Sequence, residues 1–292
     1  MAGSSRGLAL ISVLWVTTLL AVMAAGLTSS TRTERILTRN QLENAKAEAL
    51  ADAGVYRAVL GLLDLDPETG WLADGRVYRI ELPDGVTQIA IEDEEAKVDL
   101  NTAPLELLAG LFRAVGIDEE QAALLADRLG DFRDPDDEAL PLGAEDADYV
   151  RAGRARGAKD ASLIASRELL QVLGMTPELY ERVRRHVTVF SGSEGIDPLR
   201  ASRTVLAAVP GMGPEMIDAF LGARLEDDPF ALIEDEEALL DAELYFLFSR
   251  EIVYTVRAEG RTRGGAVFVR EAVVELAADV GRPFRIYAWG RG

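Results

Sequence analysis

A run of twenty uncharged residues, Leu8–Leu27, constrains this chain more than any other feature. With a rise of about 1.5 Å per residue, a helix of that length spans the roughly 30 Å hydrocarbon core of a bilayer. Arg6 lies just before the run, and a cation on the short side predicts that this side stays in the cytoplasm. The run therefore predicts one anchor that places the rest of the chain across a membrane.

The segment has three possible interpretations. A cleaved signal peptide fits the charged start and the small residues Ala24 and Ala25, but its apolar core is usually only about 7–15 residues long. A plain signal anchor would end with the apolar run. A longer helix is favoured because neither Pro nor Gly occurs between Leu27 and Ala53. Apolar or small residues then recur every three or four positions, which places them in one stripe along a helix. They are Leu42, Ala45, Ala49, Ala53, Tyr56, Leu60 and Leu63.

A short basic leader ending in Gly7, before an apolar helix that becomes amphipathic, resembles the N-terminus of type IV pilins and type II secretion pseudopilins. The resemblance implies that a prepilin peptidase cleaves between Gly7 and Leu8, with methylation of the new terminus. Related subunits carry Glu at the fifth mature position, where this chain has Ser12. The resemblance implies that this Glu meets the amine of the subunit ahead. Since an unpaired carboxylate is expensive in a bilayer, Ser12 indicates a tip subunit with nothing ahead of it.

Beyond the long helix the pattern changes twice. Val77–Leu82 and Val86–Ile91 alternate apolar and polar residues around a Pro-Asp-Gly turn, which predicts a β-hairpin. From about Val98 to about Arg250 the spacing is helical. Three more strands are predicted at Ile252–Ala258, Ala266–Leu276 and Phe284–Trp289.

We therefore expect an α+β fold in which a pilin-like long N-terminal helix packs on a small antiparallel sheet. A large all-helical insert of sterile-alpha-motif-like or helix-hairpin-helix-like units interrupts that sheet. The expected segments are a leader (1–7), the transmembrane and amphipathic helix (8–64), the first part of the sheet (65–97), a first helical unit with an acidic loop (98–195), a second helical unit (196–250) and the last part of the sheet (251–292).

The two helical units contain repeated motifs. Val98–Leu108 is similar to Ile196–Leu206, and Val172–Glu178 is similar to Val209–Glu215. In the second pair, a Gly can end one helix in a left-handed conformation, and a Pro three residues later can begin the next. These turns resemble the helix-hairpin-helix motif, which cradles DNA phosphates. However, 50 acidic residues against 31 basic ones oppose nucleic-acid binding, so we expect structural hairpins and no nucleic-acid partner.

The densest acidic region is 131–148, where eight carboxylates fall within eighteen residues beside one cation, Arg133. Carboxylates at this density repel one another unless water or a cation separates them. Calcium takes six to eight oxygens from flexible loops, and the spacing of Asp131, Asp134 and Asp136 can supply several. The Gly and terminal Glu of an EF-hand are missing. The spacing alone leaves a calcium site and a solvated acidic loop as alternatives.

Catalysis is not expected. The chain has no cysteine and one histidine, His186, so neither a zinc site of the usual ligands nor a nucleophile–histidine site has enough members. No Gly-rich phosphate loop follows a predicted strand. We predict that the protein is not an enzyme.

Over nearly its whole length the chain resembles the general secretion pathway protein K family, the large minor pseudopilins of bacterial type II secretion. The residues that carry this resemblance are Arg6-Gly7 with the Glu-free apolar helix, Val98–Pro104, Asp131–Asp136, Gly143–Asp146 and Glu168–Pro177. It implies a subunit at the pseudopilus tip that helps to initiate and cap the filament for export across the outer membrane. It also implies bound calcium, and the positions that match the acidic motif are Asp131, Asp134, Asp136, Glu145 and Asp146.

The resemblance further implies a single-pass protein of the bacterial inner membrane with its globular part in the periplasm. The implied partners are other minor pseudopilins in a tip complex and the major pseudopilin. Ala45, Ala49 and Ala53 are the expected contacts, because small residues let helices approach closely. A minor pilin of a type IV pilus and a membrane-anchored helix-hairpin-helix protein of DNA binding or uptake are the alternative functions.

Overall fold

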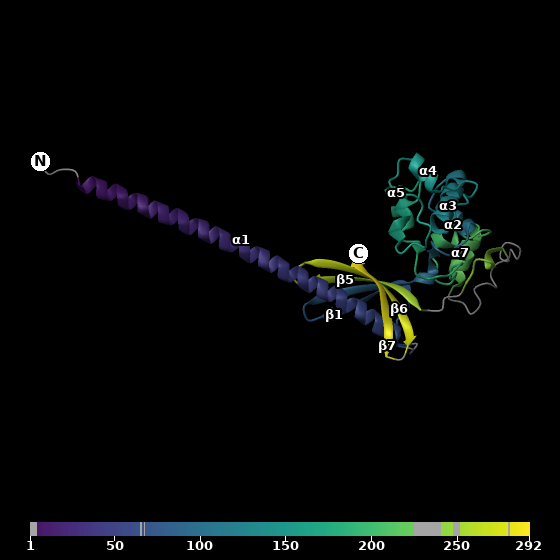
Figure 1. The fold of residues 1–292 in the computed structure, drawn as a ribbon. Helices are drawn as coiled ribbons and strands as arrows, with labels where there is room; N and C mark the ends of the chain where they lie inside the picture. Colours follow the sequence, from purple (N-terminus) through teal and green to yellow (C-terminus); the bar gives the residue numbers. More distant parts are fainter. Residues whose placement is uncertain (1–4, 65, 67, 225–240, 248–251, 280) are drawn as a thin grey trace.

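One long helix leads into a two-part globular region (Figure 1). The computed structural model describes residues 5–292 except 65, 67, 225–240, 248–251 and 280, and it excludes the side chains of 5–10, 24–33, 223 and 277–279. Helix α1 runs without interruption over Ser5–Leu62, 58 residues. The predicted continuation of the apolar segment into one amphipathic helix is confirmed.

The apolar half of α1 projects away from the rest of the molecule (Figure 1). Every large apolar side chain described between residues 11 and 23 is more than half exposed, from Val16 at 55% to Trp15 at 72%. In the part of the chain that is described, no helix has both the length and the apolarity of a membrane crossing. The predicted span 8–27 extends beyond the described side chains at both ends.

The sheet joins strands from both sides of the helical block. Its five strands are all antiparallel and lie in the order β1-β2-β5-β6-β7. The central pairing is β2 with β5, where Ile89 lies opposite Ala258, so the prediction of one interrupted sheet is confirmed. The strands are β1 (Asp74–Leu82), β2 (Gly85–Asp93), β5 (Val253–Thr262), β6 (Val267–Asp279) and β7 (Arg282–Arg291).

The C-terminal half of α1 packs on one face of this sheet. Val55, Ala58 and Val59 join alternate strand residues such as Ile89 and Val256 in a single apolar core. The helix comes very close to the strands: a Cβ at Gly54 would lie 2.5 Å from the Thr87 hydroxyl oxygen. Side chains along each strand alternate between the two faces of the sheet, so one face is apolar and the other is polar. Helix α1 covers the apolar face.

The block between β2 and β5 is mainly helical, but the expectation of an all-helical insert is wrong. β3 (Val98–Asp99) and β4 (Val187–Thr188) form a short parallel pair inside it. Val98 and Val187 are buried β-branched residues, which favour this extended pairing. The other elements are η1 (Glu94–Ala96), α2 (Leu105–Ala114), α3 (Glu119–Arg133), α4 (Asp146–Arg151), η2 (Ser166–Gln171), α5 (Pro177–Val183), α6 (Arg203–Leu206) and α7 (Pro214–Ala223).

The repeated motifs have equivalent local structures. Asp99 and Asp197 are both buried, and each accepts a hydrogen bond from the backbone N–H two residues later, at 2.7 and 2.8 Å. Gly174 and Gly211 have φ values of 97° and 84°, and a Pro begins the following helix in both cases. The predicted turn chemistry is confirmed. Of the second unit, 196–250, the structure describes residues up to 224 and then 241–247.

Candidate functional site

The predicted acidic site lies where α3 ends and the loop to α4 begins. Asp131, in the last turn of α3, is completely buried. Its carboxylate accepts hydrogen bonds from the backbone N–H groups of Leu140 (3.1 Å) and Ala144 (2.7 Å), which fold the loop around it. Gly143 permits this closure, because a Cβ there would lie 1.8 Å from Asp131 Oδ2. Asp131 therefore organises the loop, and burial followed by nearby carboxylates raises its pKa.

Glu145 is the most perturbed group in the loop. Its side chain is 8% exposed, and neither carboxylate oxygen has a hydrogen-bond partner among the described residues. Burial, followed by the negative charges of Asp131 and Asp134, raises the pKa of Glu145 to about 7. One oxygen of Asp134, Oδ1, is also buried without a partner in the described structure. Buried carboxylate oxygens of this kind are costly unless a proton or a cation compensates them.

The other predicted ligands lie at the edge of this cluster. Asp136 is exposed and accepts a hydrogen bond from the Glu138 N–H at 2.9 Å. Asp146 is exposed and lies against Gly157, where a Cβ would meet its carboxylate at 1.5 Å. Asp160 was not predicted. It has a left-handed backbone (φ 53°), and its pKa is raised by burial and then by the charge of Asp146.

The nearest cation in the sequence does not neutralise the cluster. Arg133 donates hydrogen bonds to the carbonyl oxygens of Leu100 (2.7 Å) and Ala103 (2.8 Å), on the side of α2. The unpaired oxygens of Glu145 and Asp134 fit a hard cation such as calcium, which takes oxygen ligands only. Within the described residues, no group of three or more acidic, His or Cys side chains is already arranged to hold a metal ion.

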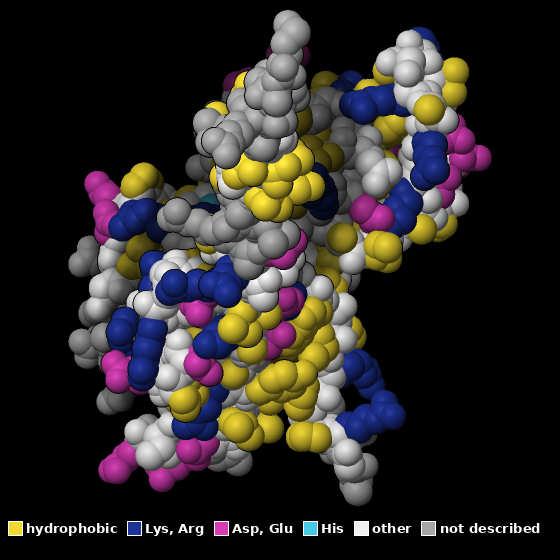
Figure 2. All heavy atoms as spheres, turned by 90° about the vertical axis from the view of Figure 1, so that its left-hand side faces the viewer, with side chains coloured by type: hydrophobic (Ala, Val, Ile, Leu, Met, Phe, Trp, Pro, Cys, Tyr) yellow, Lys and Arg dark blue, Asp and Glu magenta, His cyan; other side chains and the backbone are white. Residues whose placement is uncertain are grey.

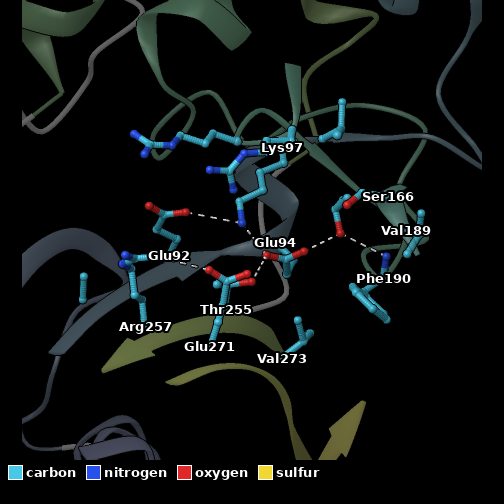
Figure 3. A pocket seen from close by; sticks show the side chains of 15 residues that line it. Glu92, Glu94, Lys97, Ser166, Val189, Phe190, Thr255, Arg257, Glu271 and Val273 are labelled. Carbon is cyan, nitrogen blue, oxygen red and sulfur yellow. Dashed lines mark hydrogen bonds and ion pairs between the residues drawn. The ribbon is translucent and has the colours of Figure 1, made fainter. Parts of the chain in front are cut away.

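A second polar centre fixes the helical block on the polar face of the sheet (Figure 3). Glu94 is 2% exposed and accepts hydrogen bonds from Lys97 Nζ and Thr255 Oγ1, each at 2.6 Å, and from the Thr188 hydroxyl. Burial opposes the charge of Lys97, but Glu94 and Glu92 outweigh it and raise the pKa of Lys97. A cavity of about 290 Å³ lies beside this centre. Glu94 thus ties β4 of the block to β5 of the sheet.

The predicted assembly stripe on α1 is exposed. Ala45, Ala49 and Ala53 face away from the sheet, whereas Ala47, Ala51 and their helical neighbours pack against it. Hydrophobic side chains gather along the helix and below it when the molecule is viewed from the N-terminal side of α1 (Figure 2). The large exposed residues of the stripe are Leu42, Tyr56 and Leu60 on α1 and Leu63 just beyond its end. Ser12 is also exposed on this helix, and the side chain of Leu8 is outside the description.

Comparison with known proteins shows which family the chain is similar to. Residues 86–192, which contain the acidic loop and Glu94, match the family described as type II secretion system (T2SS), protein K. This region of the chain is therefore similar to protein K of the type II secretion system. It is 27% identical over 217 residues to the putative type II secretion system protein K of Escherichia coli (strain K12), covering 66% of this chain and 65% of that protein. It is 26% identical over 227 residues to type II secretion system protein K of Klebsiella pneumoniae, covering 70% and 69%.

These matches span about two thirds of the length of each protein K relative. Among solved structures, the chain is similar to one in the crystal structure of the GspK-GspI-GspJ complex from the type 2 secretion system of enterotoxigenic Escherichia coli. The TM-score is 0.60 with 20% sequence identity, covering 90% of this chain and 99% of that chain. The chain therefore shares its mixed fold of a long helix, an antiparallel sheet and a helical block with that chain.

Sequence reasoning found the acidic loop but not all of its parts. Asp160 is twelve residues beyond the acidic run and enters the cluster through a left-handed backbone that the sequence does not signal. The three consecutive buried acids Asp93, Glu94 and Glu95 were also missed. The sequence does show that this acidic run directly follows a predicted strand. It does not show that the run is buried, because the burial depends on tertiary contacts with β4 and β5.

Proposed function

We propose that the chain is a minor pseudopilin at the tip of the type II secretion pseudopilus, where it helps to initiate and cap the filament. The observation that carries this proposal is the second, exposed stripe on α1. One face of the helix is already covered by the chain's own sheet, and Ala45, Ala49 and Ala53 remain available to another helix. The role is architectural and uses no catalytic residue.

The proposal includes one anchor in the inner membrane, with the globular part in the periplasm. It is supported by the uncharged run 8–27 and by exposed apolar side chains on every side of α1 between residues 11 and 23. The pilin-type leader supports cleavage after Gly7 by a prepilin peptidase. Ser12 in place of a Glu supports a position with no subunit ahead.

Calcium is part of the proposal. Asp131 shapes the loop, and Glu145, Asp134, Asp136 and Asp146 would supply carboxylate oxygens after a local rearrangement of their side chains. The support is the group of buried, unpartnered oxygens on Glu145 and Asp134. When bound, the ion would supply positive charge that compensates these carboxylates and would fix the loop between α3 and α4.

Co-purification tests the role of the stripe. The full chain, expressed with other minor pseudopilins of a type II secretion system, is expected to co-purify with them in detergent. Ala49→Gln should weaken capture at least about tenfold, because a long side chain prevents close approach of two helices. Asn44→Gln places the same side chain on α1 outside the stripe and should leave capture unchanged. Equal capture by both variants would rule out the stripe as the contact.

A further inference from the structure

One end of the sheet points toward the N-terminal half of α1 (Figure 1). Exposed arginines lie at this end, although the formal charge of the chain is −19. The β1–β2 and β5–β6 turns meet at this end, because Gly85 pairs with Thr262. Helix α1 passes directly beside both turns. Lys46 Nζ lies 3.4 Å from Asp84, and Glu43 accepts a hydrogen bond of 2.7 Å from the Thr262 hydroxyl.

Helix α1 extends this basic region toward the predicted membrane segment. Arg35, Arg39 and Lys46 project within about 40° of one another at 100° per residue, so they share one helical face. This is the face that Lys46 turns toward the β1–β2 turn. Arg35 and Arg39 are exposed positions between the sheet and residue 27.

The sheet contributes three arginines, Arg79, Arg261 and Arg263, around a shallow cavity of about 260 Å³. Viewed from the N-terminal side, Lys and Arg side chains gather beside the apolar zone of the molecule (Figure 2). Six cations on α1 and the sheet therefore share this region with five carboxylates. These carboxylates are Glu34 next to Arg35 in the sequence, Glu43 and Asp84 near Lys46, Glu81 at 4.0 Å from Arg79, and Glu259 at 2.8 Å from Arg261. The excess is positive.

We propose that this basic collar, defined as Arg35, Arg39, Lys46, Arg79, Arg261 and Arg263, rests on the anionic phospholipid surface of the membrane that holds α1. The proposal depends on the proposed membrane anchor. Anionic headgroups attract Lys and Arg side chains that come within a Debye length, about 8 Å at physiological salt. This contact would orient the globular region of the subunit relative to the membrane before the subunit joins a filament.

The dimensions allow this contact only if the helix tilts. Arg35 follows Leu27 by eight residues, about 12 Å of helix, which reaches the headgroup zone directly. Lys46 and the turns lie about 28 Å above the hydrocarbon edge when the helix is upright. Membrane helices tilt by up to about 40°, and a tilt toward the turns lowers Arg261 and Arg263 to the surface. The collar therefore selects one direction of tilt.

Fluorescence quenching measures this contact in the full chain. Since the chain contains no cysteine, Ala266→Cys carries a single fluorophore beside the β5–β6 turn. In vesicles with a headgroup quencher, quenching should be about threefold stronger with one-third phosphatidylglycerol than with phosphatidylcholine alone. It should return to the phosphatidylcholine value in the R39Q/R263Q double variant, and also at about 0.5 M salt.

A matched double variant, R154Q/R282Q, removes the same charge from exposed positions away from the collar and should keep the lipid response. Equal quenching in the two vesicle types, or equal loss in both double variants, overturns the collar. Reversal by about 10 mM inorganic phosphate at constant ionic strength also overturns it, since it would indicate a site for single anions. Failure of the chain to stay with phosphatidylcholine vesicles at all overturns the anchor itself, and with it the proposed function.

Discussion

The acidic loop contains carboxyl groups whose pKa values are raised by the fold, and Glu145 is shifted most. Glu145 has a pKa of about 7 in the folded chain, above its ordinary value of 4.5. Between these two pH values the native state holds a proton that the unfolded state has lost. Stability therefore falls as pH rises through this window, by at most about 3 kcal/mol. Asp131, Asp134 and Asp160 are shifted in the same direction.

We expect Glu145→Gln to remove most of this pH dependence. Denaturant unfolding with chelator should show wild-type stability decreasing from pH 5 to pH 7.5 and the variant nearly flat. Calcium at millimolar concentration should restore the wild type at pH 7.5, since a ligand of the native state stabilises it, and should act less on the variant. Glu138→Gln, an exposed change in the same loop, should behave as wild type. A calcium-independent wild type would reject the metal site.

Gly143 offers a second test at the residue scale. A methyl group there would collide with Asp131, so Gly143→Ala should lower the free energy of unfolding by about 1–3 kcal/mol. Gly222, near the end of α7, has no described atom within 4 Å of the position that a Cβ would occupy, and Gly222→Ala should be neutral or stabilising by up to about 1 kcal/mol. Equal effects of the two changes in thermal denaturation would contradict the closed loop.

At the scale of elements, periodicity explains what the sequence could predict. Helix α1 and the five strands of the large sheet have long, regular patterns of apolar residues. Because strands are predicted both before and after the helical block, their pairing into one sheet could also be predicted. β3 and β4 have two residues each, too few for any period, and they pair over a long sequence separation. The apolar stripe was visible, but the face of α1 that meets the sheet depends on close contacts such as Gly54 against Thr87.

The contact between block and sheet is testable through two partners of Lys97. Glu94→Gln leaves a buried cation with one partner fewer and should cost at least about 2 kcal/mol. Glu92 lies 3.3 Å from the same ammonium but is about half exposed, so Glu92→Gln should cost less than about 1 kcal/mol. Chemical denaturation compares the two variants directly. Equal costs would show that Glu94 does not hold the block in place.

At the scale of the whole molecule, the sheet and the helical block both lie at the C-terminal end of the long helix α1 (Figure 1). The sheet lies against α1, and the helical block stands beyond the sheet. We infer from the size of this block that the subunit does not repeat within a tightly packed filament shaft. Together with Ser12 in place of a Glu, the shape supports a position at the end of a filament.

The copy number in purified pseudopili tests this position most directly. Full-length chain is expressed with the major and minor pseudopilins, filaments are isolated, and each subunit is counted by mass spectrometry with isotope-labelled peptides. A tip subunit should be present at about one copy per filament whatever the filament length, while the major pseudopilin increases with length. A ratio of this chain to the major pseudopilin that stays constant as filaments lengthen would place it in the shaft and contradict the account.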